Sequence, residues 1–365
     1  MDRPVKREKD VTVVIPNYNG IQYLDLCIQS LLQGTMVPKI IVVDNGSDDG
    51  SRELLSKYPE VLVYPLSTNT GFCHAVNCGL HLVRSRYAIL LNNDVKVEKT
   101  FVERLYTTIA QSAKTFSVQA KMLSMKDPSV LDDAGDLYSI LGYARARGKA
   151  KPADTYEKRE EIFSTCAGAA IYRMAGFEKI GYFDERHYCY LEDVDIGYRA
   201  QIFGYRNLYE PKAVCYHAGS ATSGSRYNAF KESLASGNSS YLAWKNMPAF
   251  QYVINLPFLA LGRAMKQHYF TKKGLGEAFS DGLERGKALI YVAKDQDWLV
   301  RYGYFYKKRS LPEEALLEGA DDKLQQVMPL YLGTKVPFSM EHLPSYVRIQ
   351  GKLWSNLFRE LKDGQ

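Results

Sequence analysis

Asn92, Asn93 and Asp94 form a polar group directly after five apolar residues, Tyr87–Leu91. Such a run is too short for a buried helix and too uniformly apolar for a half-exposed strand, so we predict a central parallel strand covered on both faces. Open α/β sheets bind ligands at the carboxyl ends of such strands. The oxygens of an Asp and a preceding amide suit Mg²⁺ or Mn²⁺ that already carries phosphate. A simple Asx turn is the alternative explanation.

Other polar side chains follow predicted strands earlier in the chain. Asn17 follows the β-branched run Val11–Ile15, Asp44 follows Ile40–Val43, and Asn69 follows a third, shorter strand. Because the carboxyl ends of parallel strands meet at one edge of a sheet, we expect these side chains to gather beside the polar group described above.

Asp44 occupies a position that suits recognition of a nucleotide base. A carboxylate just past a buried strand can accept a hydrogen bond from the ring N–H of uracil or thymine. Helix capping explains the nearby Ser47 and Asp48, but it does not explain Asp44. The segment has neither a GxGxxG nor a Walker pattern, which disfavours a dinucleotide dehydrogenase or a P-loop enzyme.

A second group of carboxylates lies in Glu192, Asp193 and Asp195. If a helix starts near Glu192, its 100° step places Asp193 and Asp195 about 200° apart, so these two should not share one role. Asp195 and Arg199 form an i,i+4 pair of the kind that stabilises a helix by about 0.3–0.5 kcal/mol. This structural role accounts for Asp195 and leaves a carboxylate of the group available to face a cleft.

Two further features have both a functional and a structural explanation. His217 follows the predicted strand Ala213–Tyr216, where a metal ligand beside a phosphate site would lie, although a lone His is more often structural. Lys126–Asp154 is rich in Gly, Asp and basic residues. It suits an acceptor or lid segment, and a solvated connection explains it nearly as well.

The elements that must position these residues alternate between strand and helix, which predicts an α/β protein. With 46% apolar and 24% charged residues, the chain has an ordinary globular composition. The net charge of +6 is too small for binding nucleic acid mainly by charge, but it suits anionic phosphates or an anionic membrane surface. Six cysteines without a CxxC pair predict buried thiols in a cytoplasmic protein.

We divide the chain into three parts. Residues 1–10 form a charged N-terminal tail that cannot be a secretory signal, residues 11–240 form the α/β domain, and residues 241–365 are mainly helical. Within the last part, Met247–Met265 is strongly apolar but interrupted by Pro257, and no run of 18 apolar residues would span a membrane. This pattern favours a helix in the membrane interface; a buried helical hairpin is the alternative.

Six segments, taken in order, resemble glycosyltransferase family 2: VTVVIPNYNG, IIVVDNGSDDGS, NTGFCHAVNCGL, YAILLNNDV, GYFDERHYCYLEDVDIGYRA and CYHAGSATSG. Within this family the chain resembles the bacterial rhamnosyltransferase-like branch of polysaccharide assembly. The resemblance covers about residues 11–241. It implies the type-A glycosyltransferase fold, with a Rossmann-like, mostly parallel sheet and a C-terminal helical extension, and it implies an inverting, metal-dependent transfer.

The resemblance also implies a role for each candidate residue. Asp94 would bind the Mg²⁺ or Mn²⁺ that bridges the donor diphosphate, His217 would complete the metal site, and Asp193 would be the catalytic base. Many members of the family have Asp where this chain has Asn92, so its metal site carries less charge. The residues implied to bind the nucleotide sugar are Asn17, Asp44, Asn69, Asn93 and Arg199. A basic residue of the 145–149 segment is the alternative to Arg199. Asn92 and Glu192 are additional candidate residues of the site.

The resulting hypothesis is transfer of L-rhamnose from dTDP-rhamnose to a glycan or polyprenyl-linked acceptor in bacterial cell-surface polysaccharide synthesis. A UDP-hexose donor is the alternative with the same chemistry. An inactive sugar-nucleotide-binding subunit is the non-enzyme alternative, and a nucleotidyltransferase would leave Glu192 and Asp193 unexplained. We expect a cytoplasmic protein that is peripheral on the inner face of the cell membrane. Nucleic acid partners are not expected, and self-association is left open.

Overall fold

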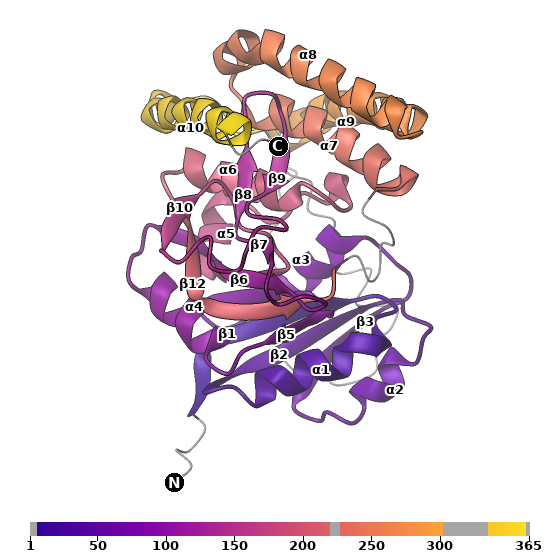
Figure 1. Ribbon diagram of the computed structural model, residues 1–365, viewed down its shortest axis with the longest axis vertical. Coiled ribbons are helices and arrows are strands. Elements are labelled where there is room, and N and C mark those ends of the chain that lie inside the picture. Colours follow the sequence, from indigo (N-terminus) through magenta and orange to yellow (C-terminus); the bar gives the residue numbers. More distant parts are fainter. Residues whose placement is uncertain (1–5, 220–226, 302–334, 363–365) are drawn as a thin grey trace.

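The computed structural model describes residues 6–219, 227–301 and 335–362 (Figure 1). Its central sheet has the strand order β10-β12-β6-β11-β4-β1-β2-β3, with β5 paired to β12 and β7 paired to β6. Helices cover the sheet, and the helices of the C-terminal part are gathered at one end of the long axis (Figure 1).

The elements have the following bounds. The strands are β1 Lys6–Asn17, β2 Met36–Asn45, β3 Val61–Leu66, β4 Tyr87–Leu91, β5 Val95–Val97, β6 Thr115–Ser124, β7 Leu131–Asp133, β8 Asp136–Tyr138, β9 Ala144–Ala146, β10 Glu160–Ile162, β11 Ala169–Arg173 and β12 Arg206–His217. The helices are α1 Ile21–Leu32, α2 Ser51–Leu55, α3 Phe72–Leu82, α4 Phe101–Ala110, α5 Met174–Ile180, α6 Glu192–Ile202, α7 Ala229–Asn246, α8 Ala249–Lys272, α9 Gly276–Arg301 and α10 Leu343–Lys362.

The predicted central strand is β4, and all five of its residues are buried. It pairs in parallel with β1, which pairs in parallel with β2, which in turn pairs in parallel with β3. On its other side, β4 pairs with the antiparallel strand β11. The parallel half of the sheet therefore matches the prediction, and it delivers the ends of β1, β2 and β4 to one edge.

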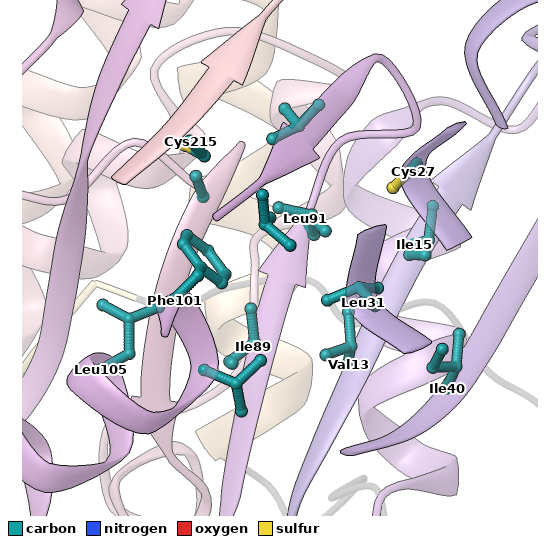
Figure 2. Packing of buried hydrophobic residues seen from close by; sticks show 14 of the residues in the cluster. Val13, Ile15, Cys27, Leu31, Ile40, Ile89, Leu91, Phe101, Leu105 and Cys215 are labelled. Atoms are coloured by element: carbon teal, nitrogen blue, oxygen red, sulfur yellow. The ribbon is translucent and has the colours of Figure 1, made fainter. Parts of the chain in front are cut away.

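The sheet separates two hydrophobic cores because successive side chains of a strand point to opposite faces. Val13 of β1 and Ile89 of β4 pack with Phe101 and Leu105 of α4 on one face (Figure 2). Val14 and Leu90, each one residue further along its strand, belong to the core on the opposite face, which also contains residues of α3, α5 and α6. Burial on both faces explains why these strands are apolar throughout.

The N-terminal end of the chain differs from the prediction. Residues 1–10 were expected to form a charged tail, but β1 begins at Lys6. Lys6 and Arg7 pair with Met36 and Val37 of β2, and the register then shifts before Thr12. Backbone hydrogen bonds between strands do not depend on side-chain polarity, so a charged segment can extend the strand.

The C-terminal helices pack on the α/β part. The predicted boundary at 240/241 lies inside α7, which runs from residue 229 to residue 246. Gly237 of α7 approaches α9 so closely that a Cβ atom at this position would lie 2.5 Å from the carbonyl oxygen of Gly282. The apolar segment predicted at 247–265 is most of α8, which continues through Pro257. Within the described residues, no helix has the length and apolar character needed to span a membrane.

Candidate active site

Polar side chains from three neighbouring strand ends are hydrogen-bonded to one another. Asn17, the last residue of β1, donates from Nδ2 to Asp44 Oδ1 at 3.2 Å. Asn93, just after β4, donates from Nδ2 to Asn17 Oδ1 at 2.7 Å. All three residues are buried. The structure therefore brings together these candidate nucleotide-binding residues, because β1 lies between β2 and β4 in the sheet.

The Asp44 carboxylate is fully buried and already has several donors. Arg52 Nε donates to Asp44 Oδ2 at 2.7 Å, in addition to the bond from Asn17. The Arg52 side chain is 46% exposed, so it covers Asp44 from the solvent side. A nucleotide base could therefore reach Asp44 only when the Arg52 side chain moves aside, which an exposed, flexible side chain can do at little cost.

Asn69 lies on the exposed rim of the same edge. Its Oδ1 accepts hydrogen bonds from Asn45 Nδ2 at 3.1 Å and from the backbone N–H of Gly71 at 3.0 Å. Gly71 has a φ of +89°, and a Cβ atom there would lie 2.5 Å from Cδ2 of Tyr188. Only glycine combines this backbone conformation with so close an aromatic ring. The loop is thus held in one shape that presents Asn69 to solvent.

Asp94 and His217 lie side by side, although they are far apart in the sequence. His217 Nε2 is 3.2 Å from Asp94 Oδ1, and His217 Nδ1 is 2.7 Å from Asp132 Oδ2. Lys149 contacts the other oxygen of Asp132. Burial alone would lower the pKa of His217, but its hydrogen bonds to Asp132 and Asp94 raise the pKa to about 10. The two carboxylates thus hold the imidazole in a single orientation.

The Asp94–His217 pair fits a divalent cation. Two neighbouring ligands of an octahedral ion with bonds of about 2.1 Å lie about 3 Å apart, close to the observed 3.2 Å separation. A metal-bound His typically donates its second ring N–H to a carboxylate, as Asp132 would accept it here. Over the described residues there is no group of three His, Cys, Asp or Glu side chains that could hold a metal. Donor phosphates and water would have to supply the remaining ligands, as is usual for Mg²⁺.

Replacing Asp94 with Ala tests this pair. Loss of the carboxylate should lower the affinity for a nucleoside diphosphate in the presence of Mn²⁺ by about tenfold or more, because changes around metal ligands commonly cost 10–100-fold in metal affinity. Titration calorimetry with and without Mn²⁺ would measure the effect, and Asp127→Ala, at an exposed loop position, is the control. An unchanged, metal-dependent affinity would remove Asp94 from the metal site.

A strained turn delivers the carboxylates at the start of α6. Tyr188, Tyr190 and Leu191 all have positive φ angles, between 61° and 72°. Non-glycine residues adopt such angles at a cost of about 1–3 kcal/mol each, and they do so mainly at functional sites. The buried Asn238 of α7 holds this turn, since its Nδ2 lies 2.8–2.9 Å from the carbonyl oxygens of His187, Cys189 and Tyr190.

Asp193 is connected to the polar edge through the segment before β11. The backbone N–H of Ala167 donates to the Asp193 carboxylate, and the carbonyl oxygen of the next residue, Gly168, accepts from the N–H of Asn92 at 2.9 Å. A Cβ atom at position 168 would lie 2.9 Å from Asn92 Nδ2, so glycine leaves room for this contact. Asp193 and the Asn92–Asp94 group are therefore both hydrogen-bonded to the short segment of residues 167–168.

Asp193 is the carboxyl group best suited to act as a base. Burial raises the pKa of Asp193 to about 6, against backbone hydrogen bonds that favour the ionised form. Burial likewise raises the pKa of the neighbouring Asp133 to about 7. It raises the pKa values of Asp136 and Glu192 well above their ordinary range, and the charge of Asp193 contributes to both shifts. Glu192 Oε2 is buried without a hydrogen-bond partner, which suits a neutral carboxyl group.

Asp195 faces away from Asp193, as the helical spacing predicts, and it has a structural role. Its Oδ2 accepts from Arg199 Nη2 at 2.8 Å and from Lys245 Nζ at 2.9 Å. Burial raises the pKa of Asp195, but Arg199 and Lys245 hold it well below its usual range. Lys245 also donates to Asp184 Oδ2 at 2.7 Å. These fully buried charges join α6 to α7.

The expectation that Arg199 binds the donor diphosphate is corrected by this arrangement. Arg199 is 1% exposed, and its guanidinium also donates to the carbonyl oxygens of Ile180, Gly181 and Tyr182. The alternative of a basic residue in the 145–149 segment fits better, because Lys149 lies beside the carboxylate that orients His217.

Several residues of the site were not identified from the sequence. Asp132 lies in the segment Lys126–Asp154, but nothing in its sequence shows that it contacts His217, which is 85 residues away. Asn238 and Lys245 lie in a helix without any recognisable motif. Arg52 has an ordinary helical position. The pairing of these side chains arises from tertiary packing, which leaves no local signal.

Comparison with known proteins gives the family of the matched segment and several similar proteins. The model of Glycosyl transferase family 2 matches residues 12–181. The N-acetylglucosaminyl-diphospho-decaprenol L-rhamnosyltransferase of Mycobacterium tuberculosis is 26% identical over 230 residues, which cover 56% of this chain and 75% of the relative.

Two solved structures share the fold at low sequence identity. One is GalNAc-T7 with UDP, GalNAc and Mn²⁺, with a TM-score of 0.53 and 15% identity, covering 67% of this chain and 48% of that one. The other is Staphylococcus aureus TarS 1–349 in complex with UDP-GlcNAc, with a TM-score of 0.50 and 18% identity, covering 72% of this chain and 73% of that one. The expected type-A glycosyltransferase fold is thereby confirmed. The chain is a glycosyltransferase, and its residues 12–181 form a Glycosyl transferase family 2 domain.

Proposed function

We propose that this glycosyltransferase moves L-rhamnose from dTDP-rhamnose, with inversion, to a polyprenyl-linked glycan in bacterial cell-surface polysaccharide synthesis. The type of reaction is supported by one observation: two chemically different groups are connected at the same edge of the sheet. One is the Asp94–His217 pair, which suits a cation bound to diphosphate. The other is Asp193, a carboxyl group with its pKa raised to about 6, as suits a base.

In this mechanism, Asp193 accepts the proton of the acceptor hydroxyl as its oxygen bonds to the anomeric carbon. The bond from that carbon to the diphosphate oxygen breaks on the opposite face, and the nucleoside diphosphate leaves with the electron pair. A cation held by Asp94 and His217 would stabilise the negative charge on the departing diphosphate. Lys149, through Asp132, keeps His217 oriented for this role.

The donor and acceptor are supported by the relative from M. tuberculosis, whose name specifies both an L-rhamnosyl group and a decaprenol-linked acceptor. A lipid-linked acceptor also supports a peripheral position on the inner face of the cell membrane. A UDP-hexose donor remains the alternative, because the base-binding residues Asn17 and Asp44 would suit uracil as well as thymine.

A panel of nucleotides tests the donor. Thermal shifts should be measured with dTDP, dTDP-rhamnose, UDP and UDP-hexoses, each with and without Mn²⁺ or Mg²⁺. We expect the dTDP compounds to stabilise the protein selectively and only with a cation, by about 2.7 kcal/mol when the ligand is present at 100 times its Kd. Selective stabilisation by UDP compounds would favour the alternative donor. The absence of any nucleotide response would contradict both.

A further inference from the structure

The N-terminal half of helix α8 buries polar side chains and exposes apolar ones, unlike an ordinary surface helix. Gln251 and Asn255 are 2% and 0% exposed, although they are polar. Val253, Ile254 and Leu261 are 66%, 62% and 53% exposed, although they are apolar. A surface helix normally buries its apolar stripe and exposes polar residues. Apolar side chains gathered on an outer face indicate a binding surface.

Hydrogen bonds fix this orientation. Gln251 Nε2 donates to Gln350 Oε1 of α10 at 2.8 Å, and Asn255 Nδ2 donates to the same oxygen at 3.0 Å. Gln350 Nε2 returns a bond to Asn255 Oδ1 at 2.7 Å, and Tyr198 of α6 donates to Gln251 Oε1 at 3.1 Å. Rotating α8 to bury its apolar stripe would break all four bonds and leave buried amides unpaired. The outward direction of the stripe is therefore specified by the fold.

The charge of α8 indicates what covers its apolar face. The helix contains no Asp or Glu. The cationic side chains of Arg263 and Lys272 are exposed, and so is Lys273, the residue that follows the helix. A second copy of the chain would bring the same positive charges against one another. An anionic lipid surface would attract them, at about 1 kcal/mol for each basic residue near the surface.

The position of α8 also suits a flat partner. The helix lies across one end of the long axis of the molecule, with α1 and α2 at the other end (Figure 1). Val347 and Phe358 of α10, the helix bonded to α8, are both 63% exposed. We propose that the outer face of α8 docks on an anionic membrane surface and lies in its plane. This proposal identifies the surface of the protein that contacts the membrane. It rests on the lipid-linked acceptor of the proposed function.

Vesicle binding tests the proposal. The double variant Val253→Asp/Ile254→Asp places two charges on the exposed stripe of α8, a helix that contributes none of the residues assigned to catalysis. Leu26→Asp is the matched control, because Leu26 of α1 is an apolar residue that is 38% exposed elsewhere on the surface. Sedimentation would be compared with phosphatidylcholine vesicles and with vesicles that also contain phosphatidylglycerol.

We expect the wild type and Leu26→Asp to bind the anionic vesicles. The double variant should bind them at least about tenfold more weakly, because it loses two interfacial side chains. Lys272→Gln/Lys273→Gln should weaken binding to anionic vesicles only. Equal binding by the double variant would overturn the proposal. Failure of the wild type to bind vesicles would overturn it as well. This includes the case in which light scattering shows that the wild type is a dimer and that the double variant is a monomer.

The nucleotide response of the same preparations separates this proposal from the proposed function. A double variant that has lost vesicle binding should still be stabilised by a nucleotide with Mn²⁺, because α8 contributes none of the assigned site residues. If no preparation responds to nucleotides, the proposed function fails whatever the vesicles show. If nucleotides bind and wild-type protein does not bind vesicles, only the docking surface fails.

Discussion

Asp193→Asn is expected to lower the rate of sugar transfer by about 10²–10⁴-fold, the usual contribution of a positioned base. The amide has nearly the same shape as the carboxylate but cannot accept the acceptor's proton. Donor binding should remain, because the carboxylate of Asp193 accepts hydrogen bonds from the backbone N–H groups of Ala167 and Val194. Single-turnover rates and calorimetric donor affinity together would measure both quantities. A variant that transfers at more than about a tenth of the wild-type rate would exclude Asp193 as the base.

The pH dependence of the wild type gives a second measure of the same residue. The base acts in its ionised form, and burial raises its pKa to about 6. The transfer rate should therefore fall about tenfold per pH unit below pH 6 and level off above it.

Asp193→Asn should also unfold at a higher temperature than the wild type at pH 8, because it removes a desolvated charge. Asp127→Asn, at an exposed position, should change neither property.

Lys245→Met is expected to lower the free energy of unfolding by about 3–5 kcal/mol, the usual cost of removing one partner from a buried ion pair. Lys245, Asp184 and Asp195 all have fully buried side chains. Met fills much of the same volume but leaves two carboxylates without the ammonium group that they share. Urea unfolding, followed by circular dichroism, would measure the change as a shift of the midpoint.

The control for this variant is Lys57→Met, because Lys57 is exposed in the turn that follows α2. A surface substitution of this kind should change stability by about 0.5 kcal/mol or less. If Lys245→Met were equally mild, the buried network would not hold α7 to α6. Asp184→Asn/Lys245→Met should recover part of the loss, since it removes a negative charge together with its positive partner.

The parallel half of the fold could be predicted because its signals are local. Runs such as Tyr87–Leu91 are apolar throughout, and this run is the buried strand β4. The gathering of Asn17, Asp44 and Asn93 followed from sheet geometry alone. These predictions needed only the period of the side chains and the rule that parallel strands end at one edge.

Arg199 shows where local reasoning ends. An Asp and an Arg four residues apart have the same spacing whether the pair is exposed or buried, so the sequence could not show that Lys245 joins them. The contact of Asp132 with His217 is equally non-local. For α8, the apolar content was visible in the sequence, but the direction of its apolar face depends on Gln350, which is 95 residues beyond Asn255.

The hydrogen bonds of Asn238 and the ion pairs of Lys245 bear on how such a chain can be recombined. Residues 12–181 match the family model, so a splice after this segment, or at residue 240, would look harmless in a sequence alignment. A chimera with a foreign C-terminal part would bury Asp184 and Asp195 without Lys245. A splice upstream of α7 would also release the three carbonyl groups held by Asn238. The smallest exchangeable unit therefore includes α7, and a new acceptor specificity is better engineered by substitutions within the chain than by swapping its helical end.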